Sequence, residues 1–177
     1  MQKRFVFFRS PFLLTLAFCL LLSALSFPGC KFNPDYQEQG QQYLQGEWLQ
    51  DTSALQKQLV TATAYRLKFS CDSFFVSMNS FSKAVAGADT CIKNGHWAEF
   101  AKGIYQQKHD TLILKGLFCN PNFSYKVEGG CFRYGNYQEA FKVKKQTDSI
   151  VRFAPLASVL PFNARLIKRN TCIPKPL

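Results

Sequence analysis

The sequence predicts an all-β domain, a small antiparallel meander of about eight strands that closes into a barrel or a sandwich and is preceded by a signal peptide. Three observations carry this prediction. Thr, Val, Tyr and Phe are concentrated in the middle of the chain, and these residue types favour strands. Gly and Pro recur at short intervals, which is typical of many tight turns. No long stretch has the apolar spacing of a helix.

The first 29 residues have the layout of a secretory signal peptide. A basic start at Lys3 and Arg4 is followed by an apolar run over 12–22 and a short segment that ends at Gly29, directly before Cys30. A membrane-spanning anchor is the alternative. The apolar run is short for that role, since crossing the hydrocarbon core takes about 20 residues. We therefore expect a leader that is cleaved after Gly29.

The cleavage region resembles the lipobox of bacterial lipoproteins, whose usual form is Leu, a small residue and then Gly or Ala before the modified Cys. Gly29 fits this form, whereas Phe27 and Pro28 depart from it. The resemblance implies that Cys30 carries a diacylglycerol and an acylated amine, with chains of the palmitate type. Two or three such chains anchor a protein stably, at about 0.8 kcal/mol per buried CH₂. The expected partner is membrane lipid contacted through Cys30, and the expected location is the cell envelope outside the cytoplasm. Plain secretion is the alternative.

The chain is basic, with a formal net charge of +11. Three basic residues lie in the leader, which has no acidic residue, so +11 less these three leaves +8 for residues 30–177. The other basic residues are spread along the chain and often alternate with apolar ones, as on the exposed face of a strand. A basic surface can attract anionic lipid or glycan over a long range. Nucleic acid is not expected as a partner of an exported protein.

Residues 30–45 are polar and rich in Gln, so we expect a tether there, with room for a short helix near 36–44. The β domain is expected over 46–177. In the stretch 62–69 apolar and basic residues alternate with the period of a half-buried strand. The expected strands cover residues 46–50, 62–69, 74–78, 95–105, 111–118, 125–128, 138–145, 149–154 and 164–169. Closing such a sheet removes the exposed edges that invite aggregation.

The chain has seven cysteines, of which one lies in the leader and Cys30 is expected to be acylated. Five remain in the expected domain: Cys71, Cys91, Cys119, Cys131 and Cys172. In an oxidising compartment they allow at most two disulfides and one spare thiol. Cys71 and Cys91 bracket an apparent hairpin, and Cys131 with Cys172 is placed to clip the last strand to the sheet, but the residues alone leave the pairing open. No C-x-x-C pair occurs and the two histidines lack ligand spacing, so neither a metal site nor a cofactor is expected.

Gly46 and Trp48 form a Gly-x-Trp motif that resembles the first strand of lipocalin-like proteins. In that superfamily the Trp plugs one end of an up-and-down barrel. The resemblance therefore implies a lipocalin-like barrel in which Gly46 and Trp48 are structural core residues at the base of the first strand.

A second resemblance covers most of the chain after the leader. It is carried by the segments 71–74, 95–105, 110–112, 129–137 and 171–175. These segments resemble a group of small lipocalin-like bacterial lipoproteins, some of which carry the name fumarate hydratase. The resemblance implies that four cysteines belong to a shared pattern and that Cys119 does not. On that basis we expect the disulfides Cys71–Cys91 and Cys131–Cys172, with Cys119 free.

The residues do not support hydratase chemistry. Class II fumarases carry a Gly-Ser-Ser-x-Met-Pro-x-Lys-x-Asn loop on a large helical tetramer, and this chain has neither the loop nor a helical pattern. Iron–sulfur fumarases need cysteine ligands for a cluster in a far larger protein. The only histidines, His96 and His109, have no nucleophile motif nearby and are expected at a strand surface and in a turn. A Ser–His–acid set would have to assemble in three dimensions.

The favoured function is a lipid-anchored module of the cell envelope that binds a small apolar ligand or meets envelope partners. Trp97 and Tyr105 are the candidate pocket residues, although Trp97 suits a core position equally well. An open interior with converging polar groups would favour ligand binding, and a filled interior with an exposed apolar patch would favour interaction. An enzyme whose site is hidden from the sequence is the alternative.

Overall fold

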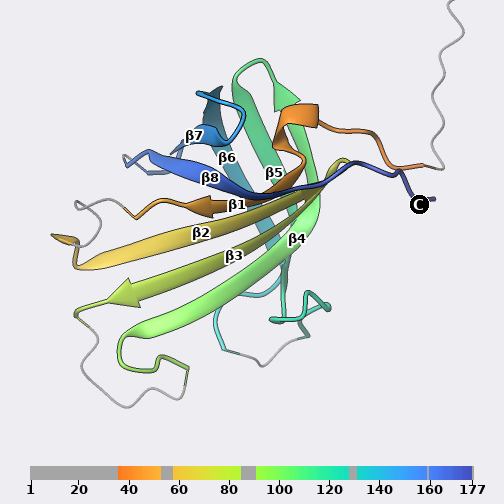
Figure 1. Cartoon of the computed structure of the whole chain (residues 1–177). Coiled ribbons are helices and arrows are strands. Elements are labelled where there is room, and N and C mark those ends of the chain that lie inside the picture. The colour runs from red at the N-terminus through yellow and green to blue at the C-terminus, as the bar shows by residue number, and fades with distance from the viewer. Residues whose placement is uncertain (1–35, 53–57, 85–90, 128–130, 159, 177) are drawn as a thin grey trace, which may run out of the picture. The chain divides into compact units, whose positions relative to one another are not determined.

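The chain forms a closed barrel of eight antiparallel strands, which confirms the all-β prediction (Figure 1). The computed structural model describes residues 36–52, 58–84, 91–127, 131–158 and 160–176. The strands follow one another around the barrel in chain order, and β8 pairs with β1 to close it. Their bounds are β1 (Gly46–Gln50), β2 (Thr61–Ser70), β3 (Ser73–Ser82), β4 (His96–Lys108), β5 (Thr111–Cys119), β6 (Asn136–Lys145), β7 (Ile150–Pro155) and β8 (Phe162–Arg169). A 3₁₀ turn, η1 (Gln42–Leu44), precedes β1.

The expected alternation of apolar and basic residues is present in β2. Leu67 and Phe69 point into the barrel and are almost fully buried, while Arg66 and Lys68 between them are exposed. Successive strand residues face opposite sides of a sheet, so this period of two separates an apolar interior from a basic outer surface. The same separation in the other strands gives the barrel a continuous core.

One expected strand, at residues 125–128, is wrong in its described part. Tyr125 makes only an isolated bridge with Cys119, and neither of the next two residues is in a strand. The reason lies in the preceding turn, where Phe123 has a left-handed backbone with a φ of 59°. Its ring meets Phe75 and Phe100 on the outside of the barrel at centroid distances of 5.2 and 5.9 Å. The chain therefore doubles back onto the sheet instead of adding to it.

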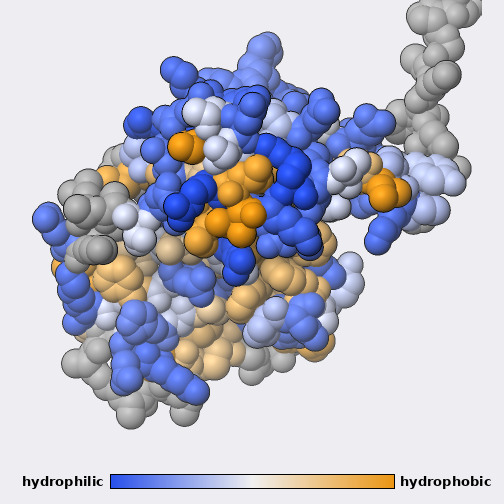
Figure 2. Space-filling model, in the orientation of Figure 1, coloured by the Kyte–Doolittle hydropathy of each residue, from blue (hydrophilic) through white to orange (hydrophobic). Residues whose placement is uncertain are grey.

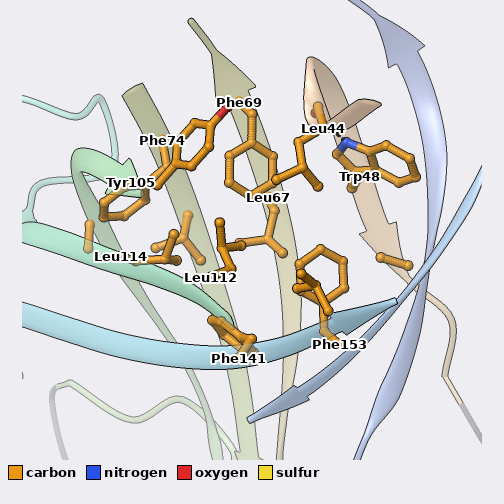
Figure 3. Packing of buried hydrophobic residues seen from close by; sticks show 14 of the residues in the cluster. Leu44, Trp48, Leu67, Phe69, Phe74, Tyr105, Leu112, Leu114, Phe141 and Phe153 are labelled. Atoms are coloured by element: carbon orange, nitrogen blue, oxygen red, sulfur yellow. Dashed lines mark hydrogen bonds between the residues drawn. The ribbon is translucent and has the colours of Figure 1, made fainter. Parts of the chain in front are cut away.

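Trp48 lies in the dense core of the barrel (Figure 3). Its side chain is 1% exposed, and its indole N–H donates a 2.7 Å hydrogen bond to the carbonyl of Leu44 in η1. The guanidinium of Arg169 lies 5.6 Å above the indole ring. Gly46 comes so close to β8 that a Cβ there would lie 2.4 Å from the carbonyl oxygen of Lys168. This close approach explains why residue 46 is a glycine. The Gly-x-Trp motif thus sits at one end of the barrel, beneath η1.

Residues 36–45, which the sequence assigns to a tether, lie against this same end of the barrel. Gln45 is 3% exposed, and its carboxamide accepts a hydrogen bond from the backbone N–H of Cys71 at 2.7 Å and donates one to the Cys71 carbonyl at 2.8 Å. The hydroxyl of Tyr105 accepts hydrogen bonds from the Gln45 side chain at 3.0 Å and from the Gln41 backbone at 2.9 Å. We call this the closed end, because Leu44 and its neighbours cover the core there.

The two chain ends of the described domain also meet at the closed end. Tyr36 forms a bridge with Pro176, and the Gln37 N–H donates to the carbonyl of Lys175 at 3.0 Å. The expected signal peptide, Cys30 and the first residues of the expected tether lie outside the described residues. Across the described part of the chain, none of the helices has the length and apolar character needed to cross a membrane.

The expected disulfide pairing is wrong. Cys71 is bonded to Cys172, and Cys91 is bonded to Cys131. Closure of the barrel explains the first bond, because it brings the end of the chain to the turn between β2 and β3 at the closed end. The second bond joins the loop after β3 to the loop after β5 at the other end. Cys119 is free and buried, and burial raises the pKa of its thiol.

Candidate functional site

The end of the barrel opposite η1 has a hollow of about 420 Å³, which we call the mouth. It lies where β1 and β7 end and where β2 and β8 begin. None of the described residues that line it is charged. Its lining is Gln50, Leu59, Thr61, Ala62, Thr63, Tyr65, Pro155, Ser158, Leu160 and Phe162.

Aromatic rings form the floor of the mouth. Tyr65 and Phe162 stack with their ring centroids 5.2 Å apart and their planes within 5° of parallel. Phe162 stacks in turn on Phe153 at 5.4 Å, and Phe141 meets Tyr65 edge-on at 6.0 Å. Below these rings the interior is filled by buried side chains as far as Leu44. The mouth is therefore a cup above a packed core, with room for one small ligand.

A carboxylate lies inside the barrel beside this floor. Glu139 on β6 accepts a 2.8 Å hydrogen bond from the Tyr65 hydroxyl and a 2.5 Å one from the Tyr137 hydroxyl. Burial and the charge of Glu139 raise the pKa of both tyrosines far above the usual value, so both remain hydrogen-bond donors. Tyr65 therefore both lines the hollow and hydrogen-bonds to the carboxylate of Glu139.

A second acid at this end has its own cation. Glu99 on β4 is 8% exposed, and it accepts hydrogen bonds from the Nε and Nη2 atoms of Arg133 at 2.9 and 2.7 Å. Burial acts to raise the pKa of Glu99, but hydrogen bonds and charge from Arg133 outweigh it and hold the pKa below its ordinary value. The guanidinium also lies 4.7 Å from the centroid of the Phe118 ring. This ion pair fastens the loop between β5 and β6 to the barrel.

The structure separates the two pocket residues suggested by the sequence. Trp97 is half-buried near the start of β4, opposite Ser80, and stacks on Phe132 with centroids 6.2 Å apart. Tyr105 is buried at the closed end, where burial raises its pKa to about 12. Neither belongs to the lining of the mouth.

The residues that do build the mouth were missed by the sequence reasoning. Tyr65 was assigned to the inner face of its strand but not to a site. Glu139 lies between Tyr137 and Phe141 on the inward side of β6. An acidic residue at a position where the strand pattern calls for an apolar one was the signal that could have identified Glu139. Phe162 precedes the expected start of the last strand.

The histidines do not form a catalytic set in the described structure. His96 is exposed at the start of β4, and its ring lies 6.1 Å from that of Phe81. His109 is exposed in the turn between β4 and β5 and has a φ of 55°. Among the residues that the structure describes, no group of three or more His, Cys, Asp or Glu side chains could hold a metal ion. The described groups within reach of the mouth are aromatic faces, hydroxyls and one acid.

Comparison of the chain with protein-family models, with curated proteins and with solved structures found no match.

Proposed function

We propose that this protein is a lipid-anchored, lipocalin-like protein of the cell envelope whose barrel mouth binds one small, largely apolar ligand. The observation that carries the proposal is the hollow of about 420 Å³ at the mouth, which is floored by Tyr65 and Phe162 and whose described lining residues are all uncharged. Ligand sites are commonly concave and mostly apolar, with a few placed polar groups. Thr63, whose hydroxyl lies 2.8 Å from that of the buried Ser80, supplies such a group in the lining.

The anchoring part of the proposal rests on the leader and on Cys30. Two disulfides among the described residues suit a protein that matures outside the cytoplasm. The resemblance to small lipocalin-like bacterial lipoproteins points the same way. Metabolic labelling with a fatty-acid probe is expected to mark the native chain and not Cys30→Ser. Equal labelling of both would refute the anchor.

Ligand binding is tested with N-phenylnaphthylamine, a neutral apolar dye whose fluorescence rises in a dry site. We expect the native protein to enhance its emission and Thr63→Phe to abolish the enhancement, because the larger ring occupies the hollow. Thr111→Phe makes the same change at the start of β5, near the closed end, and serves as the matched control. Enhancement that survives Thr63→Phe, or is lost equally in the control, would show that the mouth is not the site.

A further inference from the structure

A second hollow, of about 360 Å³, lies on the outer surface of the barrel over β3, β4 and β5. We call it the outer groove. Three of its lining side chains are apolar yet exposed, namely Ile104 at 52%, Leu117 at 36% and Tyr125 at 66%. Figure 2 shows hydrophobic residues between hydrophilic ones over β3 and β4. The groove therefore offers apolar surface to solvent.

The register of the strands places lysines between these apolar side chains. Lys102 on β4 has Phe75 opposite it on β3 and Leu117 opposite it on β5. Two residues further along the same face, Ile104 is opposite Lys115. The two lysines are thus diagonal neighbours across one strand pair, at positions roughly 7–8 Å apart, so both long side chains can reach one anionic group.

The ion pairs among the described residues include neither Lys102 nor Lys115. The three strands beneath the groove carry a single acidic residue, Glu99, and it lies inside the barrel. Lys102 is placed at the rim, where its ammonium lies 4.5 Å from the centroid of the Tyr125 ring. The outer groove combines an apolar floor with two lysines that make no ion pair with any other residue that the structure describes.

From this combination we infer that the outer groove binds a single-chain amphiphilic anion, with its acyl chain on Phe75, Ile104 and Leu117 and its acidic head between Lys102 and Lys115. An apolar chain gains from leaving water along the exposed floor. A carboxylate or sulfate head accepts charge-assisted hydrogen bonds from both ammonium groups. The net positive charge of the chain also favours the approach of anions. This site is separate from the mouth and does not depend on the proposed function.

Sodium laurate, kept below its micelle-forming concentration, is the probe. Titration followed by calorimetry and by backbone amide shifts is expected to show saturable binding, with the largest shifts in β3, β4 and β5. Dodecylammonium, which has the same chain and the opposite charge, is expected to bind at least about tenfold more weakly, since it cannot accept hydrogen bonds from the lysines.

The double variant Lys102→Gln, Lys115→Gln is expected to weaken laurate binding about tenfold or more. The double variant Lys144→Gln, Lys168→Gln removes the same charge from two exposed lysines on β6 and β8 and is expected to keep native affinity. Both pairs are on the outer surface, so folding should be retained, which circular dichroism checks.

Three results would overturn the inference: no saturable laurate binding, equal weakening in both double variants, or equal affinity for dodecylammonium. Thr63→Phe separates this inference from the proposed function. Laurate binding that persists in Thr63→Phe supports the outer groove. Laurate binding that is lost there but kept in the Lys102 and Lys115 variant assigns the anion to the mouth and refutes the groove.

Discussion

The contact between Gln45 and Cys71 predicts that the supposed tether stabilises the barrel. Gln45→Leu keeps nearly the same side-chain volume but removes the carboxamide that binds both backbone groups of Cys71. Cys71 has a left-handed backbone, with a φ of 55°, and is itself 1% exposed. Neither water nor pairing with a neighbouring strand therefore easily replaces the hydrogen bonds that its N–H and carbonyl lose.

The size of the effect follows from these two groups. A buried backbone donor or acceptor left without a partner costs about 1–3 kcal/mol. Two such groups, less the cost of burying the carboxamide that leucine no longer carries, give an expected loss of roughly 2–4 kcal/mol in the free energy of unfolding. With a urea m-value of about 2 kcal/mol per molar, typical of a small domain, the unfolding midpoint should fall by about 1–2 M.

Urea unfolding followed by tryptophan fluorescence measures this change. The matched control is Gln106→Leu, since Gln106 is exposed on β4. The control is expected to leave the midpoint almost unchanged. If Gln45→Leu unfolds at the same urea concentration as the control, residues 36–45 do not stabilise the barrel and the reasoning fails.

Three further predictions concern the core, the ion pair and the free thiol. Trp48→Ala should cost about 3–5 kcal/mol through lost packing and a cavity, and Trp97→Ala clearly less because its ring is half-buried; similar urea midpoints for the two would contradict this. The pKa of Glu99 is lower in the folded than in the unfolded state, so its contribution to stability is present above the unfolded pKa and is lost as pH falls through the folded pKa. Glu99→Gln should therefore reduce the loss of stability at acid pH. An unchanged loss would show that other groups cause the acid sensitivity. Cys119 is buried with a raised thiol pKa, so iodoacetamide should label it only after unfolding, and rapid labelling of the native protein would exclude its burial.

Local pattern predicted the strands well where one face is buried. The alternation of Leu67 and Phe69 with Arg66 and Lys68 marked β2, because burying one side of a sheet imposes a period of two. The stretch after Cys119 misled the same reasoning. Its residue types suit a strand, but the left-handed Phe123 and its packing against the outer surface decide the path of the chain.

Long-range features were beyond the reach of local pattern. The partner of Cys71 lies 101 residues away and comes close only because β8 closes on β1. The polar stretch before Gly46 shows no apolar period, since a single buried leucine and the carboxamide of Gln45 hold it in place. The mouth was equally hidden, because its lining comes from the ends of four strands and the loops beside them.

If Cys30 is acylated as proposed, the meeting of Tyr36 and Pro176 at the closed end determines which end of the barrel faces the membrane. Cys30 precedes Tyr36 by six positions, a stretch that spans at most about 20 Å even when fully extended. On the proposed anchoring, the closed end therefore stays next to the bilayer. The mouth then opens toward the aqueous space, and its ligand arrives by diffusion through water instead of laterally from the lipid.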